Sequence, residues 1–195
     1  MAMTGDAQAA KRTRKGTRPL DAGRLEELAL SYVARFATSA SRLEGYLVRK
    51  VRERGWDGDD EPPIERLVSR YVELGYVDDA AFARSRAGSL LRRGYGPRRI
   101  GQALGQAGID TETRDEVRPD EADERRAALT LARKRGFGPF GRGRGGGEPL
   151  DRALRERQLA AMLRAGHRLD TAREIVDASS EDAAELWVAE AEEEH

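Results

Sequence analysis

The chain has 195 residues, 38% of them hydrophobic, with equal numbers of basic and acidic side chains and no net charge. This length allows a hydrophobic core, whereas the absence of cysteine excludes disulfides and thiolate zinc sites. The sequence contains two histidines, His167 and the last residue, His195, and so few argue against a histidine-rich metal centre or a Ser/His/Asp hydrolase. No apolar run approaches the ~20 residues that span a bilayer, and no signal peptide is recognisable. We therefore expect a soluble cytoplasmic protein without a metal or cofactor.

The charges are unevenly distributed along the chain. Residues 1–20 carry five basic side chains and one acidic side chain, whereas residues 179–195 carry seven acids and no Lys or Arg. We expect a disordered basic arm over 1–20, a folded body, and an acidic tail over 179–195. The tail could be a fraying amphipathic helix or an inhibitory flap over a basic surface, and a solvated terminus is the form we expect.

Apolar spacing predicts three helices in the first part of the chain. The first covers residues 22–37, with apolar side chains at the intervals that place them on one helical face. The second begins after Ser39 or Ser41, both suitable N-caps, and ends at Gly55. The third ends at Gly75.

The same pattern then recurs twice. The middle helix of each round ends at a glycine, and these glycines, Gly55, Gly108 and Gly166, lie 53 and 58 residues apart. His167 follows the last of them, and we expect it to cap the helix or face solvent. The six helices predicted after Gly75 cover 79–93, 97–107, 111–118, 120–135, 148–166 and 167–178.

These elements predict an all-α fold, an elongated or curved tandem array of three three-helix repeats over 21–77, 78–119 and 120–178. The third repeat is interrupted by a glycine-rich segment, 136–149, which is incompatible with regular structure. One interpretation of this segment is an RNA-binding sequence, with Phe137 and Phe140 available for base stacking. A flexible loop between helices is the favoured interpretation.

The tetrapeptide "YVDD", residues 76–79, has two possible interpretations. In reverse-transcriptase-like polymerases such a motif holds Mg²⁺ at a strand–turn–strand hairpin. Here helices are predicted on both sides, and adjacent residues on a helix point about 100° apart. The favoured interpretation is structural: Asp78 caps the next helix, and Asp79 lies at the positive end of its dipole.

Two stretches contain basic side chains and no acid. Such stretches predict a positive surface suited to phosphates or to an acidic protein groove. The alternative is that these arginines lie on solvated helix faces and have no partner. Only four of the basic residues in the chain are lysine, so codon bias toward arginine could account for them. The residues expected to contact a partner are Arg84, Arg86, Arg92, Arg93, Arg98 and Arg99 in the first stretch, and Arg133, Lys134 and Arg135 in the second.

The chain resembles the RecX family of RecA regulators. The resemblance rests on "LGYVDDAAFARSRA" and "GYGPRRIGQALGQAGI", is close over 28–109, and is looser in the third repeat because of the glycine-rich segment. It implies tandem three-helix repeats and no catalytic residues. The residues that it marks as a structural signature are Gly75, Tyr76, Asp78, Asp79, Phe82, Ala83, Gly96, Pro97 and Ile100.

The resemblance further implies a protein that lies in the groove of the RecA filament on single-stranded DNA and restrains filament growth, ATP hydrolysis and strand exchange. An autonomous, non-specific helical DNA-binding protein is the alternative, and a metal-dependent nucleotidyl transferase is a distant third. We expect a monomer, because three stacked repeats can bury their own apolar faces.

Overall fold

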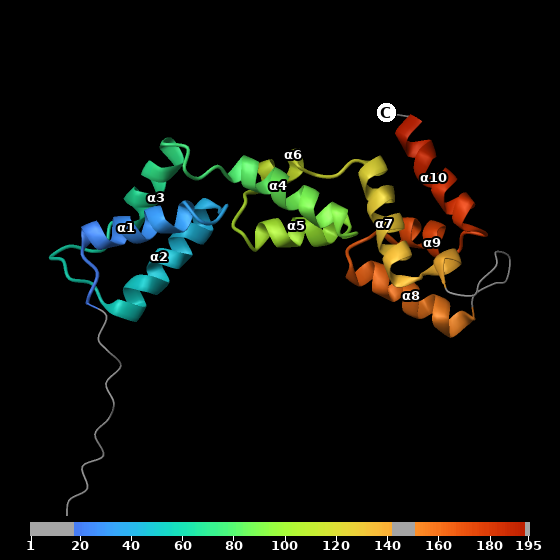
Figure 1. Ribbon diagram of the computed structural model, residues 1–195, viewed down its shortest axis with the longest axis horizontal. Helices are drawn as coiled ribbons and strands as arrows, with labels where there is room; N and C mark the ends of the chain where they lie inside the picture. Colours follow the sequence, from blue (N-terminus) through green and yellow to red (C-terminus); the bar gives the residue numbers. More distant parts are fainter. Residues whose placement is uncertain (1–17, 142–150, 194–195) are drawn as a thin grey trace, which may run out of the picture.

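The computed structural model describes residues 18–141 and 151–193. Within them the chain is helical, with one isolated β-bridge and no strand, so the expected all-α fold is confirmed. Three groups of helices follow one another along the long axis of the molecule (Figure 1). Each group contains its own cluster of buried hydrophobic side chains, and no cluster draws members from two repeats, although the third also includes Ala184 and Val188 of the C-terminal helix. The array is therefore three small cores in a row.

The first repeat contains α1 (Ala22–Val33), α2 (Ala40–Arg54) and α3 (Ile64–Glu73). Its first helix ends four residues before the expected end. Leu20 belongs to this repeat and not to a disordered arm, because its side chain is fully buried and its backbone pairs with Trp56. Residues 1–17 of the expected arm lie outside the described residues.

The second repeat contains α4 (Asp79–Arg92), α5 (Pro97–Gly105) and the short α6 (Thr111–Glu116). Proline is favourable at the first position of α5, where a backbone N–H would have no partner within the helix. The side chains of Ile100 and Leu104 on α5 pack against Phe82 and Leu90 on α4 and form the second core.

The third repeat begins with α7 (Glu121–Arg135) and continues through a short 3₁₀ helix, η1 (Gly138–Phe140). The described part of the expected flexible loop is thus ordered: the Gly138 N–H donates to Oε1 of Gln158 at 2.8 Å. Phe137 and Phe140 are partly buried and pack against the third core. The rest of the expected loop, 142–149, lies outside the described residues.

The chain then forms α8 (Arg152–Arg164), α9 (Leu169–Val176) and a further helix, α10 (Glu181–Glu193). The expectation of a solvated terminus is wrong for these residues, because α10 packs on α7 and buries Ala184, Val188 and Ala191. These three side chains are four and three residues apart, a spacing that places them on one helical face.

Polar contacts join the first repeat to the second at what we call the first seam. The buried hydroxyl of Ser39 donates to the carbonyl oxygen of Ala107 at 2.5 Å, across 68 residues of sequence. The Ala40 N–H donates to Oδ1 of Asp79 at 2.8 Å. The guanidinium of Arg42 lies 5.3 Å from the centre of the Phe82 ring. Directional bonds between two turns thus set the angle between these repeats.

Two turns also meet at the second seam, between the second and third repeats. The Gly96 N–H donates to the Ala165 carbonyl oxygen at 3.0 Å, and the Arg98 N–H donates to the Gly166 carbonyl oxygen at 3.2 Å. A Cβ atom on Gly96 would lie 2.5 Å from the carbonyl carbon of Gly166. The two backbones can approach this closely only because both positions are glycine.

His167 completes the second seam and is fully buried, so the expected solvent-exposed position is wrong. Its Nε2 atom lies 3.0 Å from the carbonyl oxygen of Gly94, to which the neutral ring can donate. Burial lowers the pKa of His167, an effect that this hydrogen bond partly opposes. The ring is held neutral because it lies between two repeats.

The stability of the protein should therefore fall as the pH drops below about 6.5, the ordinary pKa of histidine. The unfolded chain takes up a proton there while the folded chain, whose pKa at His167 is lower, does not. Between the two pKa values the free energy of unfolding should fall by up to about 1.4 kcal/mol per pH unit. Urea denaturation from pH 7.5 to 5 measures this. His167→Gln, which retains a donor toward Gly94, should show a smaller slope; an unchanged slope would contradict the assignment.

Candidate basic interface

The two aspartates of "YVDD" each accept a backbone hydrogen bond at the start of a different helix. Oδ1 of Asp78 accepts from the Ala81 N–H at 2.8 Å and so caps α4. Oδ1 of Asp79 accepts from the Ala40 N–H at the start of α2. This arrangement supports the structural interpretation of the motif, because the two carboxylates serve separate repeats. Among the described residues, no group of three or more His, Asp or Glu side chains could hold a metal ion.

The other signature residues occupy structural positions as well. Gly75 has a φ of +73°, which favours glycine, and Tyr76 packs edge-on against Tyr71. Phe82 and Ala83 are buried in the second core. Gly96, Pro97 and Ile100 lie, respectively, at the second seam, at the first position of α5 and in the second core.

The six arginines of the first basic stretch share one property: within the described part of the chain, none forms an ion pair with a carboxylate. Five of them are exposed, and Arg86 is half-buried with an unpartnered Nε atom. Arg93 lies over the Tyr95 ring at 5.3 Å, and Arg99 donates to Oε1 of Gln102 at 2.8 Å. These guanidiniums are available to anionic groups of a partner.

Four of these arginines flank the turn between α4 and α5. Arg92 and Arg93 end the first helix, and Arg98 and Arg99 lie in the first turn of the next. We call this group the arginine turn. It lies at the second seam, where the backbone of Gly96 is bonded to the third repeat, so its position is set by two repeats together.

A groove with a volume of about 390 Å³ extends from the arginine turn along α5 and α6. Ile100 and Leu104 contribute apolar surface, and Asp115 is its one acidic residue. The arginines lining the groove are Arg98, Arg114, Arg118 and Arg168. The sequence analysis identified the first of these but missed the other three, because acidic residues lie close to each of them in the chain and no acid-free stretch marks them.

The second basic stretch differs from the first because acidic side chains engage several of its members. Arg133 forms an ion pair with Glu185 of α10, and its guanidinium lies 5.7 Å from the centre of the Phe140 ring. Lys134 and Arg135 are exposed, and neither makes an ion pair within the described residues. The same acid-free stretch of the sequence, residues 125–147, also includes Arg142 and Arg144, which lie outside the described residues. The open basic surface is therefore centred on the second repeat.

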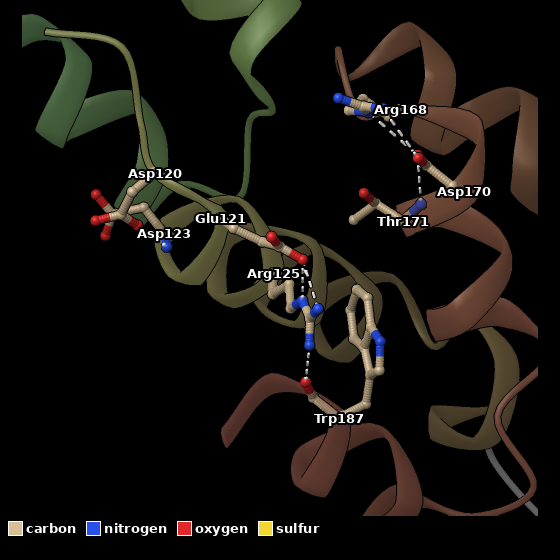
Figure 2. Close-up of polar contacts among 8 residues, drawn as sticks. All are labelled: Asp120, Glu121, Asp123, Arg125, Arg168, Asp170, Thr171 and Trp187. Carbon is tan, nitrogen blue, oxygen red and sulfur yellow. Dashed lines mark hydrogen bonds and ion pairs between the residues drawn. The ribbon is translucent and has the colours of Figure 1, made fainter. Parts of the chain in front are cut away.

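A polar cavity of about 420 Å³ lies beside this surface, between α7, α9 and α10. Glu124 lines it, and burial raises the pKa of that carboxyl despite nearby arginines. Figure 2 shows Arg168 bonded to Asp170 across the cavity from Arg125, which lies between Glu121 and Trp187.

No helix in the described ranges is long and apolar enough to span a membrane.

Comparison with known proteins identifies relatives that are named regulatory protein RecX. The family model described as the RecX second three-helix domain matches residues 78–117. The regulatory protein RecX of Myxococcus xanthus is 34% identical over 163 residues, which cover 80% of this chain and 85% of that protein. The protein of the same name from Halorhodospira halophila is 31% identical, covering 83% and 94% of the two chains.

Solved structures agree in fold. The crystal structure of RecX from Lactobacillus salivarius superposes with a TM-score of 0.60 and 17% identity, covering 86% of this chain and 96% of that one. A second crystal structure, of a regulatory protein RecX, also has a TM-score of 0.60, with 20% identity and coverages of 79% and 70%. These similarities confirm an array of three-helix repeats.

Proposed function

Because this chain belongs to the RecX family of regulatory proteins, we propose that it binds the RecA filament on single-stranded DNA and restrains it. The filament is a helical polymer of repeated protomers, and an elongated array of three joined repeats is suited to contact more than one of them. The proposed consequence is inhibition of filament growth, ATP hydrolysis and strand exchange in recombination and repair. The protein would act in the cytoplasm as a monomer.

One observation carries this proposal at the level of residues: the arginine turn makes no ion pair with a carboxylate of the described residues, and backbone bonds hold it at a seam. Arginine presents a planar set of donors that matches phosphate and carboxylate oxygens. A rigidly placed group of arginines binds such oxygens at a smaller cost in side-chain and backbone entropy than a mobile group would. The groove beside it adds Arg114, Arg118 and Arg168 to the same surface.

The DNA-dependent ATPase of RecA, measured with increasing amounts of the full chain, tests the proposal. We expect inhibition at amounts below one molecule per RecA protomer, because one bound array blocks monomer addition to a whole filament end or segment. Strand exchange should fall in parallel. An ATPase rate that is unchanged at every ratio would refute the proposed function.

The same unpaired arginines favour one alternative, an autonomous protein that binds DNA phosphates without RecA. This alternative predicts inhibition that follows competition for free DNA and disappears at moderate salt, because phosphate contacts release counterions. Inhibition that persists when DNA is in excess, and at moderate salt, supports binding to the filament.

A further inference from the structure

Helix α10 covers one face of α7 with matched charges. Arg126 donates to Oε1 of Glu192 at 2.6 Å, and Arg133 pairs with Glu185. The two arginines are seven residues apart, and so are the two glutamates, in the opposite order along the chain. Seven residues are two helical turns, so each pair lies on a single face of its helix. The two helices therefore run antiparallel with their charges in register.

Arg125, the residue before Arg126, also joins the two helices. Its Nη1 atom donates to the Trp187 carbonyl oxygen at 2.6 Å, its guanidinium lies 4.3 Å from the centre of the Trp187 ring, and Glu121 holds it from the other side (Figure 2). Its side chain is only 15% exposed. Arg125 thus fixes α10 against α7, whereas the Arg126–Glu192 and Arg133–Glu185 pairs are about half exposed and open to solvent.

The acids of α10 do not all serve this contact. Glu185 and Glu192 face basic side chains of α7, whereas Glu181 and Glu190 are exposed and form no ion pair within the described residues. The helix carries no basic residue. Lys134, the residue after Arg133, is exposed as well. Without Glu185 and Glu192, α7 would present a basic strip formed by Arg126, Arg133 and Lys134, in which Asp123 of the same helix still pairs with Arg126.

We propose that this strip is a second nucleic-acid-binding surface, specific for the phosphate backbone, and that Glu185 and Glu192 of α10 mask it. The inference deepens the proposed function, on which it rests for its biological setting, by assigning DNA phosphates as the ligand of α7. Exposed ion pairs of this kind are weak, so a polyanion that offers several phosphates at once competes with them effectively.

The test compares two full-length variants that remove the same charge from the same helix. Glu185→Gln with Glu192→Gln removes both ion pairs between α7 and α10 and leaves Arg126 with Asp123 as its one acidic partner among the described residues, whereas Glu181→Gln with Glu190→Gln leaves both of these pairs in place. Binding of fluorescein-labelled oligothymidylate is followed by anisotropy over a range of salt concentrations, in the absence of any recombinase. Thermal unfolding of each variant verifies that α10 remains packed.

We expect the unmasked variant to bind roughly tenfold more tightly than the wild type at low salt. Its plot of log Kobs against log salt should be steeper by about 1.4, because two further phosphate contacts each add about 0.7 on a single strand. The control should gain less than half of that affinity and keep the wild-type slope. Adding Arg126→Gln and Arg133→Gln to the unmasked variant should cancel the gain.

Two outcomes overturn the inference. Equal gains in both variants would show that only the overall charge of α10 matters, and no gain in either would show that α7 does not bind phosphates. Neither outcome bears on inhibition of the RecA ATPase, which is measured separately with the wild-type chain. Failure of the masking inference is thereby distinguished from failure of the proposed function.

Discussion

Replacing Arg92, Arg93, Arg98 and Arg99 with glutamate should abolish inhibition of the RecA ATPase while leaving the protein folded. The four side chains are exposed and form no ion pair with a described carboxylate, so their reversal breaks no internal charge pair. Reversal places four like charges against the phosphates or carboxylates that we expect them to contact. We expect the concentration for half-inhibition to rise at least about 100-fold, since losing a desolvated charge contact costs 2–5 kcal/mol.

A matched control reverses four exposed arginines elsewhere in the array and therefore changes the net charge equally. The first three lie in the first repeat and the fourth lies on α8: Arg35, Arg52, Arg66 and Arg157. This control should retain most of the inhibition, and circular dichroism should show both variants to be helical. Should the two variants lose inhibition to the same degree, the arginine turn has no special role.

Gly96→Ala should open the second seam and cause a large loss of stability. The new Cβ would lie 2.5 Å from both the Gly166 carbonyl carbon and the His167 nitrogen, which are backbone atoms and cannot rotate away. The turns must separate, and the bonds across them lengthen or break. We expect a cost of about 3 kcal/mol, at the upper end for overpacking, together with weaker inhibition.

Gly101→Ala is the matched control, because it adds the same methyl group to α5 five residues later. Nothing lies within 4 Å of a Cβ atom there, and alanine favours a helix by about 1 kcal/mol over glycine. Denaturant unfolding should give this variant an equal or higher midpoint. Hydrogen exchange should show faster exchange at residues 94–98 and 165–167 in Gly96→Ala alone. Equal midpoints for the two variants would contradict the close approach of the turns.

Much of this fold follows from local signals that are legible in the sequence. The apolar spacing and the terminating glycines predicted the helices of the three repeats, and the N-cap role of Asp78 was predicted from its position before α4. These signals are legible because they depend on residues within a turn or two of each other. The ends of helices were less accurate: Phe36 continues the apolar spacing of α1 but is 57% exposed.

Contacts between repeats could not be predicted, because they depend on how distant turns meet. Nothing near Asp79 in the sequence indicates that its carboxylate caps α2, and nothing near His167 indicates burial against Gly94. For α10, the acidic side chains concealed an apolar spacing that was present in the sequence. The arginines of the groove were missed for a similar reason: an acidic residue that is close to an arginine in the sequence need not be close to its side chain in the folded protein.

The division of buried apolar side chains into three separate clusters has a mechanical consequence. Each repeat is stiff because of its own core, whereas the bend between repeats is held by a few hydrogen bonds, including those of Ser39 at one seam and Gly96 at the other. Bending such a molecule costs far less than unfolding any part of it. We therefore expect the array to adjust its curvature to the helical filament that we propose as its partner, while every repeat remains intact.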